Sequence, residues 1–375
     1  MKKILVLAGC LVLCVAVLCG CGVPGGSAFG CGGVTVDPIV TKKPWSNNNN
    51  YEYIEYSVQR YYTETTDDGE AYKLGGVEAE GTYSTTMYTI ASNIYEWSKW
   101  DSLLVSNARL GGYFKDNLAT GGKLVSTPGA YGLLVTDYSL TYADGSDYAG
   151  KTDSIYSVVL FEYGSLEPVY SEKIAAYSTS DNSYTAVADY VEGRNILTAE
   201  GQDAVETKIT ASGSVYDNEL LYYLLRASSS MSLGGSGTFT MHNAVYGGLN
   251  GAQSERSMGF SVASASATIE GLDPDDEWLV PTYFDDGDVT YYDGQNDEHE
   301  KGYALPAYAT TVQLNSQEPG SARHMLYYSA AAFNCIGSVT SNVLLRSVDT
   351  ESDNDGIVRR ANVATISDYK ISELM

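Results

Sequence analysis

Short segments in which polar residues alternate with aromatic or β-branched ones recur along this 375-residue chain, separated by turn residues. The first is the segment YEYIEYSVQRYY at residues 51–62. A period of two places successive side chains on opposite faces of a strand, whereas a helix needs a period of 3.6. The pattern therefore predicts a fold built from many strands, with the first at residues 51–62.

Turn chemistry predicts how these strands connect. Asp68-Gly69 is a hairpin signal, and a second strand is expected near residues 81–90. Nearly all of residues 124–213 is of the β type. Regular short strands with turn signals between them are typical of an antiparallel meander. The further strands expected are 132–142, 154–163, 169–177, 184–191, 237–241, 258–269, 307–314, 325–329, 339–346 and 363–371.

Two segments have helical spacing instead. In residues 92–104, two tryptophans and two aliphatic residues recur three or four positions apart. In residues 217–227 (DNELLYYLLRA), Asp217 is a suitable N-cap and four leucines form one apolar stripe. The expected fold class is therefore mainly β (α+β), with one or more large antiparallel, curved sheets and two or three helices packed on them.

The start of the chain has the composition of an export leader. Lys2 and Lys3 precede an uncharged, mostly apolar run that ends at residue 21. Residues 22–50 are rich in Gly, Pro and Asn, as in a flexible tether. The expected organisation is a leader at 1–21, a tether at 22–50, an N-terminal β-rich half at 51–212, and a helix plus C-terminal β-rich half at 213–375. The sequence leaves open whether the two halves share one sheet.

Leu18-Cys19-Gly20-Cys21 resembles a bacterial lipobox. The resemblance implies that the thiol of Cys21 receives a diacylglycerol and becomes the N-terminus after cleavage. Leu7-Ala8-Gly9-Cys10 matches the lipobox letters better, but only about six apolar residues precede it, and a signal core needs about 7–15. The alternative is a plain signal peptide or an uncleaved anchor.

The body of the chain also resembles a known group. The segments DNELLYYLLRA (217–227), AYATTVQLNSQEPGSARHMLYYSAAAF (307–333) and NVLLRS (342–347) are similar to uncharacterised β-rich lipoproteins of Gram-positive bacteria. Those proteins are in turn similar to open half-barrels of the LolA and LppX type. The resemblance covers about residues 150–371 and implies a concave sheet that holds a lipid. It carries over no catalytic residue.

Composition limits the partners. The formal net charge is −25 at pH 7, which repels nucleic acid and anionic headgroups. Nucleic-acid binding is excluded on this ground. The 32 tyrosines, beside 7 phenylalanines and 4 tryptophans, fit half-buried strand positions. They also fit a sugar-binding surface.

Catalytic motifs are scarce in the sequence. His242, His299 and His324 are the only histidines, and none has metal-ligand spacing. Ser367 and Lys370 have the letters of a Ser-x-x-Lys motif, but the companion triplets are out of order. Paired carboxylates for glycoside cleavage stay open among 47 acidic residues. No cofactor is expected.

One acidic stretch is a weak candidate for a calcium loop. Glu351, Asp353 and Asp355 stand at the first three ligand positions of such a loop, and Gly356 stands at its sixth. Position 12 is Asn362, and two arginines lie inside the stretch, so an acidic hairpin turn is the alternative. A disulfide between Cys31 and Cys335 is also left open, because such bonds form outside the cell.

These observations predict an extracytoplasmic lipoprotein on the membrane of a Gram-positive bacterium, anchored through the diacylglycerol on Cys21. The expected role is non-catalytic binding or carriage of a hydrophobic ligand or a cell-wall component in a concave sheet. A carbohydrate-binding or adhesion module is the first alternative, and a cell-envelope hydrolase is the second.

Overall fold

A computed structural model gives the fold. It describes residues 50–65, 72–90, 131–180, 183–209, 214–227, 236–243, 255–272, 303–314, 324–329, 333–335, 338–340, 344–352 and 357–373. The Cys21 anchor, the helix expected at 92–104 and His299 lie outside these residues. Among the described residues, no helix has the length and apolar composition needed to cross a bilayer.

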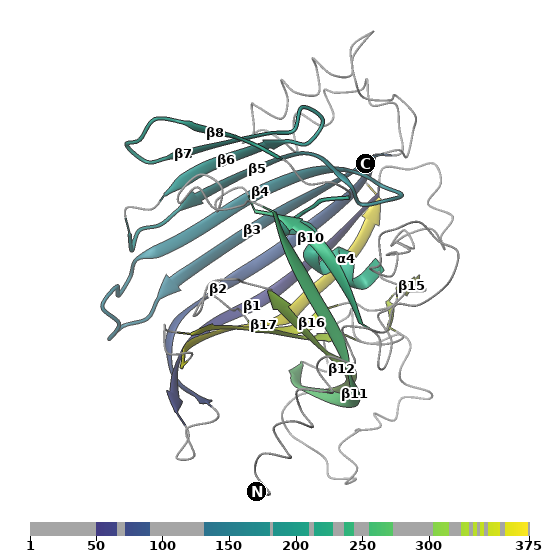
Figure 1. Ribbon diagram of the computed structural model, residues 1–375. Coiled ribbons are helices and arrows are strands. Elements are labelled where there is room, and N and C mark those ends of the chain that lie inside the picture. The colour runs from purple at the N-terminus through teal and green to yellow at the C-terminus, as the bar shows by residue number, and fades with distance from the viewer. Residues whose placement is uncertain are drawn as a thin grey trace, which may run out of the picture.

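The first half of the chain forms the strands of a meander (Figure 1). Each strand pairs antiparallel with the one before it. The strands are β1 (Asn50–Thr65), β2 (Tyr72–Ile90), β3 (Tyr131–Tyr142), β4 (Thr152–Glu162), β5 (Pro168–Ala176), β6 (Tyr184–Asp189), β7 (Arg194–Ala199) and β8 (Val205–Lys208). The strands expected in this half are confirmed, and β7 and β8 add two that had not been delimited.

The second half begins with a helical segment, and its later strands follow one another from the β9 edge of the sheet towards β1. Its elements are β9 (Tyr216–Asp217), the 3-10 turn η1 (Asn218–Leu220), α4 (Leu221–Ala227), β10 (Ser236–His242), β11 (Glu255–Leu272), β12 (Tyr303–Leu314), β13 (His324–Ser329), β16 (Leu344–Ser352) and β17 (Val358–Glu373). The strand expected at 339–346 is wrong as one element. It is divided between β16 and the small β14–β15 hairpin (Phe333–Cys335 and Ser338–Thr340).

The two halves share one sheet of 15 strands. Its order is β8-β7-β6-β5-β4-β3-β2-β1-β17-β16-β13-β12-β11-β10-β9, so the first and last strands of the chain pair at its centre. Every pairing except β9–β10 is antiparallel. The prediction of a large antiparallel, curved sheet is confirmed.

The expected number of helices is not confirmed. The described part of the chain contains one α-helix of seven residues, α4, preceded by η1. The predicted N-cap is correct, because the Asp217 carboxylate accepts a hydrogen bond from the backbone N–H of Glu219. The polar first residues form a 3-10 turn, and the α-helix begins only at Leu221.

The core lies on the concave face, where the sheet curls around η1 and α4 (Figure 1). Inward residues of β1 alternate as the sequence predicts, with Ile54, Tyr56 and Val58 all at most 3% exposed. The helix buries Leu220, Leu221, Tyr223, Leu224 and Leu225 against them. Burial of this apolar surface is the main stabilisation of the curl.

The β9–β10 end of the sheet turns back over β5 and β6. The Tyr190 hydroxyl, just after β6, donates to Asp217 on β9 at 2.6 Å. The ring of Tyr190 also lies edge-on to His242 of β10, with centroids 5.5 Å apart. The sheet is thus strongly curved, yet its two edge strands, β8 and β9, do not pair with each other.

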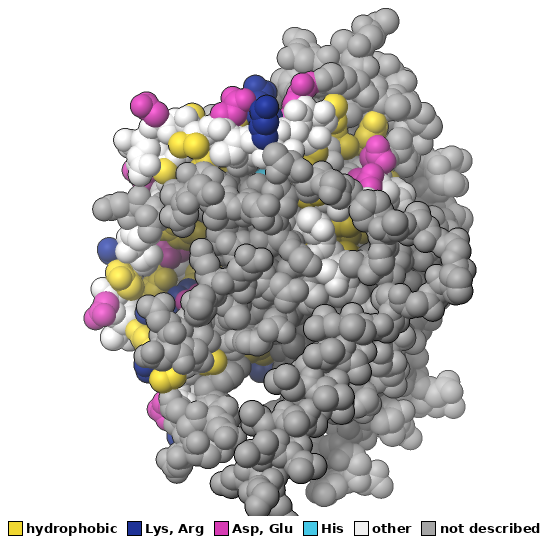
Figure 2. Space-filling model, viewed as in Figure 1, with side chains coloured by type: hydrophobic (Ala, Val, Ile, Leu, Met, Phe, Trp, Pro, Cys, Tyr) yellow, Lys and Arg dark blue, Asp and Glu magenta, His cyan; other side chains and the backbone are white. Residues whose placement is uncertain are grey.

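The edge strand β8 is exposed and carries Glu206 and Lys208. Charged side chains on an edge strand oppose pairing with another chain. Acidic and basic side chains both lie along this upper edge of the molecule in Figure 2. The opposite edge, β9, is only two residues long, which limits it as a pairing template.

Candidate functional site

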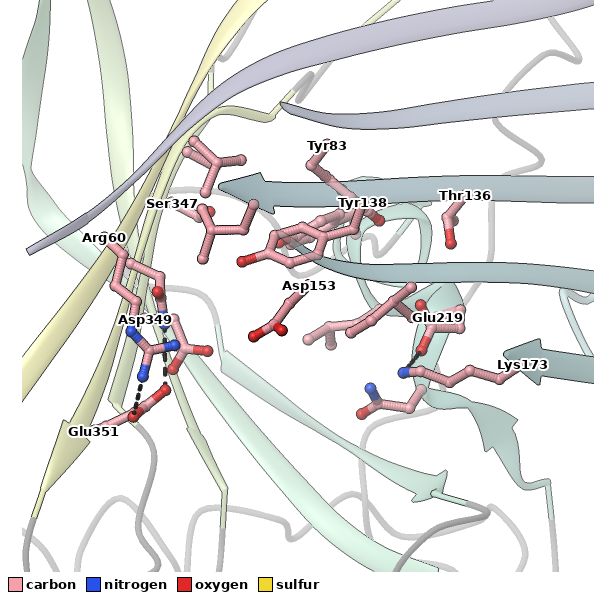
Figure 3. Close-up of a pocket in the computed structure, with 18 of the residues that line it drawn as sticks. Arg60, Tyr83, Thr136, Tyr138, Asp153, Lys173, Glu219, Ser347, Asp349 and Glu351 are labelled. Carbon is pink, nitrogen blue, oxygen red and sulfur yellow. Dashed lines mark hydrogen bonds and ion pairs between the residues drawn. The ribbon is translucent and has the colours of Figure 1, made fainter. Parts of the chain in front are cut away.

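A cavity of about 360 Å³ lies between the concave face of the sheet and the η1–α4 segment (Figure 3). Strand register explains which residues reach it. Tyr56 of β1 pairs with Tyr83, Tyr83 with Tyr138, and Tyr138 with Ile155, so these side chains form one inward row. A parallel row contains Ser347, Ala364, Val58, Gly81, Leu140 and Asp153.

Tyrosine rings form much of the apolar wall. Tyr56 and Tyr83 stack with centroids 5.8 Å apart, and Tyr222 of α4 meets the edge of Tyr83 at 5.9 Å. Next to it on the helix, the Tyr223 hydroxyl lies 2.9 Å from Thr85 Oγ1. The helix is therefore fixed over the sheet by ring contacts and a buried hydrogen bond.

Two of the lining rings, Tyr83 and Tyr138, stay neutral well above neutral pH. Burial raises the pKa of Tyr83 well above its ordinary value, and neighbouring tyrosines and Glu219 raise it further. Burial also raises the pKa of Tyr138, an effect that Arg60 partly opposes. Tyr83 and Tyr138 therefore present neutral phenol rings to the cavity.

One end of the cavity is an ion network that joins four adjacent strands. Arg60 Nε lies 3.1 Å from Glu78 of β2, and Arg60 Nη2 lies 3.1 Å from Glu351 of β16. Arg360 of β17 also contacts Glu78, at 2.8 Å. The register of β1 against β2 shifts between Arg60 and Tyr61, as at a β-bulge. Beside this shift, two successive residues of β2, Glu78 and Ala79, are both buried.

The other end is an ion pair between sheet and helix. Lys173 Nζ of β5 lies 2.5 Å from Glu219 Oε1 of η1. Burial, the largest single effect, would lower the pKa of Lys173, but Glu219, Tyr184 and Asp217 together outweigh it and the net shift is upward. Lys173 therefore stays charged, and the pair holds η1 to the sheet.

Asp153, at the start of β4, lies between the two ends of the cavity (Figure 3). It is 6% exposed. Its Oδ1 accepts from the backbone N–H groups of Ser178 and Thr179 at 2.8 and 3.3 Å, and from the Ser178 hydroxyl at 3.4 Å. Its Oδ2 accepts from the hydroxyls of Thr179 and Tyr142, at 2.9 and 3.1 Å.

The residues singled out in the sequence have mixed outcomes. Glu351 lies in β16 and its carboxylate accepts from Arg60, whereas Asp353 and Asp355 lie outside the described residues. The calcium loop therefore stays a prediction, as does the lipidation of Cys21. Within the described ranges, no group of three His, Cys, Asp or Glu side chains is placed to hold a metal ion. Cys335 is on β14, and Cys31 lies outside the described residues.

None of the residues of the weaker catalytic motifs is among the described residues that line the cavity. Ser367 and Lys370 lie three positions apart on β17. Ser367 contacts Glu55 at 3.5 Å. His242 is 1% exposed and packs against Tyr190, away from the residues that line the cavity. His324 lies on β13.

Sequence reasoning missed the cavity residues, although a signal for two of them exists. Arg60 continues the inward phase of Ile54, Tyr56 and Val58, and Asp153 begins the inward phase of β4. A charge in the buried phase of a strand requires a partner or a function. That signal could have identified Arg60 and Asp153, but it names no partner for either.

Comparisons with known proteins add little to this geometry. No protein-family model matches the chain, and no curated protein matches its sequence. A solved structure with some similarity is the crystal structure of a β-barrel-like protein of domain of unknown function DUF1849 from Brucella abortus. The match has a TM-score of 0.42 and 5% identity, and covers 88% of this chain and 99% of that one.

Proposed function

We propose that this protein is an exported lipoprotein, anchored through Cys21, that binds a small amphiphilic ligand on the concave face of its sheet without transforming it. The observation that carries the proposal is the tyrosine-lined cavity under α4. Its volume of about 360 Å³ lies at the lower end of the range for small-molecule sites, roughly 300–1,000 Å³. This size favours a single-chain or ring-sized molecule over a lipid with two acyl chains.

The mixture of surfaces supports an amphiphile. Leu140, Ile155 and Leu221 offer apolar contact, and charged side chains stand at both ends of the cavity. Ligand sites are typically apolar with a few placed polar groups. Glu219 and Glu351 are engaged in ion pairs, and Asp153 is engaged by the 178–179 backbone. Such engaged groups are better suited to structure and orientation than to proton transfer.

A small carbohydrate is the second candidate for the same cavity. Thr136, Asn218, Ser347 and Asn362 add hydroxyl and amide groups to its lining. Sugars bind by stacking on rings and by hydrogen bonds to such groups. This candidate differs from the first in requiring no long apolar tail.

A pair of adjacent residues on opposite faces of β17 allows a controlled test. Ala364 lines the cavity, and Thr365 points to the other face. The full-length protein, Ala364→Leu and Thr365→Leu would be purified from bacterial membranes and extracted with organic solvent and with aqueous methanol. Mass spectrometry would then compare the bound small molecules. We expect an amphiphile in the wild type and in Thr365→Leu, and its loss in Ala364→Leu. A sugar with the same pattern would favour the second candidate, and no cavity-dependent molecule in any extract would contradict both.

A further inference from the structure

Asp153 brings a negative charge into the cavity that no cation among the described residues balances. All five of its hydrogen-bond donors, on Tyr142, Ser178 and Thr179, are neutral. In the part of the chain that the structure describes, no Lys or Arg lies within ion-pairing distance of it. Neutral donors stabilise a carboxylate, but they do not cancel its charge.

The cations that line the cavity are already neutralised elsewhere. Lys173 is paired with Glu219. Arg60 pairs with Glu78 and Glu351, and Arg360 pairs with Glu78, in a network of two positive and two negative charges. The field of Asp153 therefore remains, and the described residues of the lining include four carboxylates against Arg60 and Lys173. A buried, uncompensated charge is costly, and a counter-charge on a ligand would relieve that cost.

The hydrogen-bonding state of Asp153 restricts the kind of cation. Its Oδ1 already accepts three hydrogen bonds and its Oδ2 accepts two. An oxygen with this many donors has little capacity for another. A cation that needs no hydrogen bond, such as an alkylated ammonium, can still use the charge.

Aromatic rings beside Asp153 suit the same group. Asp153 pairs with Leu140 of β3, and Tyr138 is the next residue of β3 that points inward. Tyr83 and Tyr222 also line the cavity. The faces of neutral phenol rings attract cations within about 6 Å, and alkylated ammonium groups are typical occupants of such sites. Leu140, Ile155 and Leu221 can contact the apolar remainder.

We propose that the cavity binds a small organic cation, whose alkylated ammonium group lies beside Asp153 against the rings of Tyr138 and Tyr83. This inference rests on the proposed function, since it names the chemical class of the ligand for the same cavity. The net charge of −25 favours the approach of such a cation at low ionic strength. An anionic amphiphile is disfavoured for the same reason.

Three probes that each contain a chain of six carbon atoms, counting the carboxyl carbon of the acid, compare the headgroups: hexyltrimethylammonium, 1-hexanol and hexanoate. Each would be titrated calorimetrically into the purified full-length protein. We expect the cation to bind at least about tenfold more tightly than hexanol, and hexanoate to bind most weakly. The isosteric variant Asp153→Asn should weaken the cation about tenfold and leave hexanol unchanged. Asp203→Asn, an exposed acid before β8, is the control and should change neither.

Two further measurements keep the outcomes distinct. Tyr138→Leu removes a ring without touching the 178–179 loop, and it should also reduce the preference for the cation over hexanol. Circular dichroism would verify that each variant is folded. Equal affinity for the cation and hexanol, or an unchanged preference in both folded variants, would overturn the cation proposal. If hexanol still bound in that case, the proposed function would stand. Binding of none of the three probes would contradict both.

Discussion

The ammonium of Lys173 on β5 lies 2.5 Å from the carboxylate of Glu219 in the turn that precedes α4. The pair joins residues 46 positions apart and ties the helix over the cavity. Its side chains are 23% and 14% exposed, so solvent screens it only in part. Together with the hydrogen bond between Tyr223 and Thr85, it links the η1–α4 segment directly to the sheet.

Replacing Glu219 by Gln should destabilise the protein by about 1–3 kcal/mol, because Lys173 keeps its charge without a carboxylate partner. Urea unfolding followed by tryptophan fluorescence would measure the change. Glu206→Gln on the exposed strand β8 is the matched control and should cost less than about 0.5 kcal/mol. Equal effects of the two substitutions would contradict the structural role of the pair.

Glu78 is the shared partner of Arg60 and Arg360, and its side chain is only 2% exposed. Glu78→Gln should cost about 2–3 kcal/mol, less than the roughly 3–5 of a fully buried pair because Arg360 is 38% exposed. Glu80, two residues along the same strand, is exposed and provides the control Glu80→Gln. Chemical denaturation of the two variants would compare them, and a loss at Glu80 as large as that at Glu78 would argue against the network.

Gly81 is required by a close approach of two strands. A Cβ atom at this position would lie 1.8 Å from the backbone oxygen of Ser139, whereas a Cβ at Gly76 of the same strand would meet nothing within 4 Å. Gly81→Ala should therefore destabilise by about 1–3 kcal/mol through displacement of β2 from β3. Gly76→Ala should be neutral or slightly stabilising. Thermal unfolding distinguishes them, and matching midpoints would disprove the packing constraint.

Buried tyrosines should make the protein sensitive to alkaline pH. Burial raises the pKa of Tyr83 and Tyr190 well above the ordinary value of 10.0. Above that value the unfolded chain loses protons that the folded chain keeps, so the unfolded state is favoured and stability falls as pH rises. Phenolate absorbance should show a class of tyrosines that ionise only on unfolding. Tyr83→Phe should lose less stability than the wild type between about pH 8 and about pH 11, and an identical loss would refute this origin.

Lipidation at Cys21 is tested by two cysteine variants. Cys21→Ser should abolish incorporation of labelled fatty acid and leave the leader uncleaved at this site. Cys10→Ser, at the alternative lipobox, should retain label and membrane attachment. Loss of label in Cys10→Ser with retention in Cys21→Ser would assign the anchor to the other cysteine.

Much of the local structure could be predicted because it depends on local patterns. The alternation in residues 51–62 identifies β1 and its inward phase, and Asp217 identifies the start of the helical segment. The error at 339–346, which is divided between β15 and β16, arose because the polar stretch Thr340-Ser341-Asn342 was not treated as a turn signal. β7 and β8 are four to six residues long, which is too short for alternation to be recognised in the sequence.

The sequence by itself determined the class of the fold, the inward face of its strands and an expected anchor at Cys21. Only the tertiary structure decided that β1 pairs with β17, that Arg60 reaches Glu351 across 291 positions, and that Asp153 shares a cavity with Tyr138. The physical reason is that side-chain phase is set by neighbours along the chain, whereas strand pairing and charge compensation are set by residues that folding brings together. Asp153 illustrates the difference: its inward phase can be predicted from β4, but only the folded sheet shows that no cation among the described residues pairs with it.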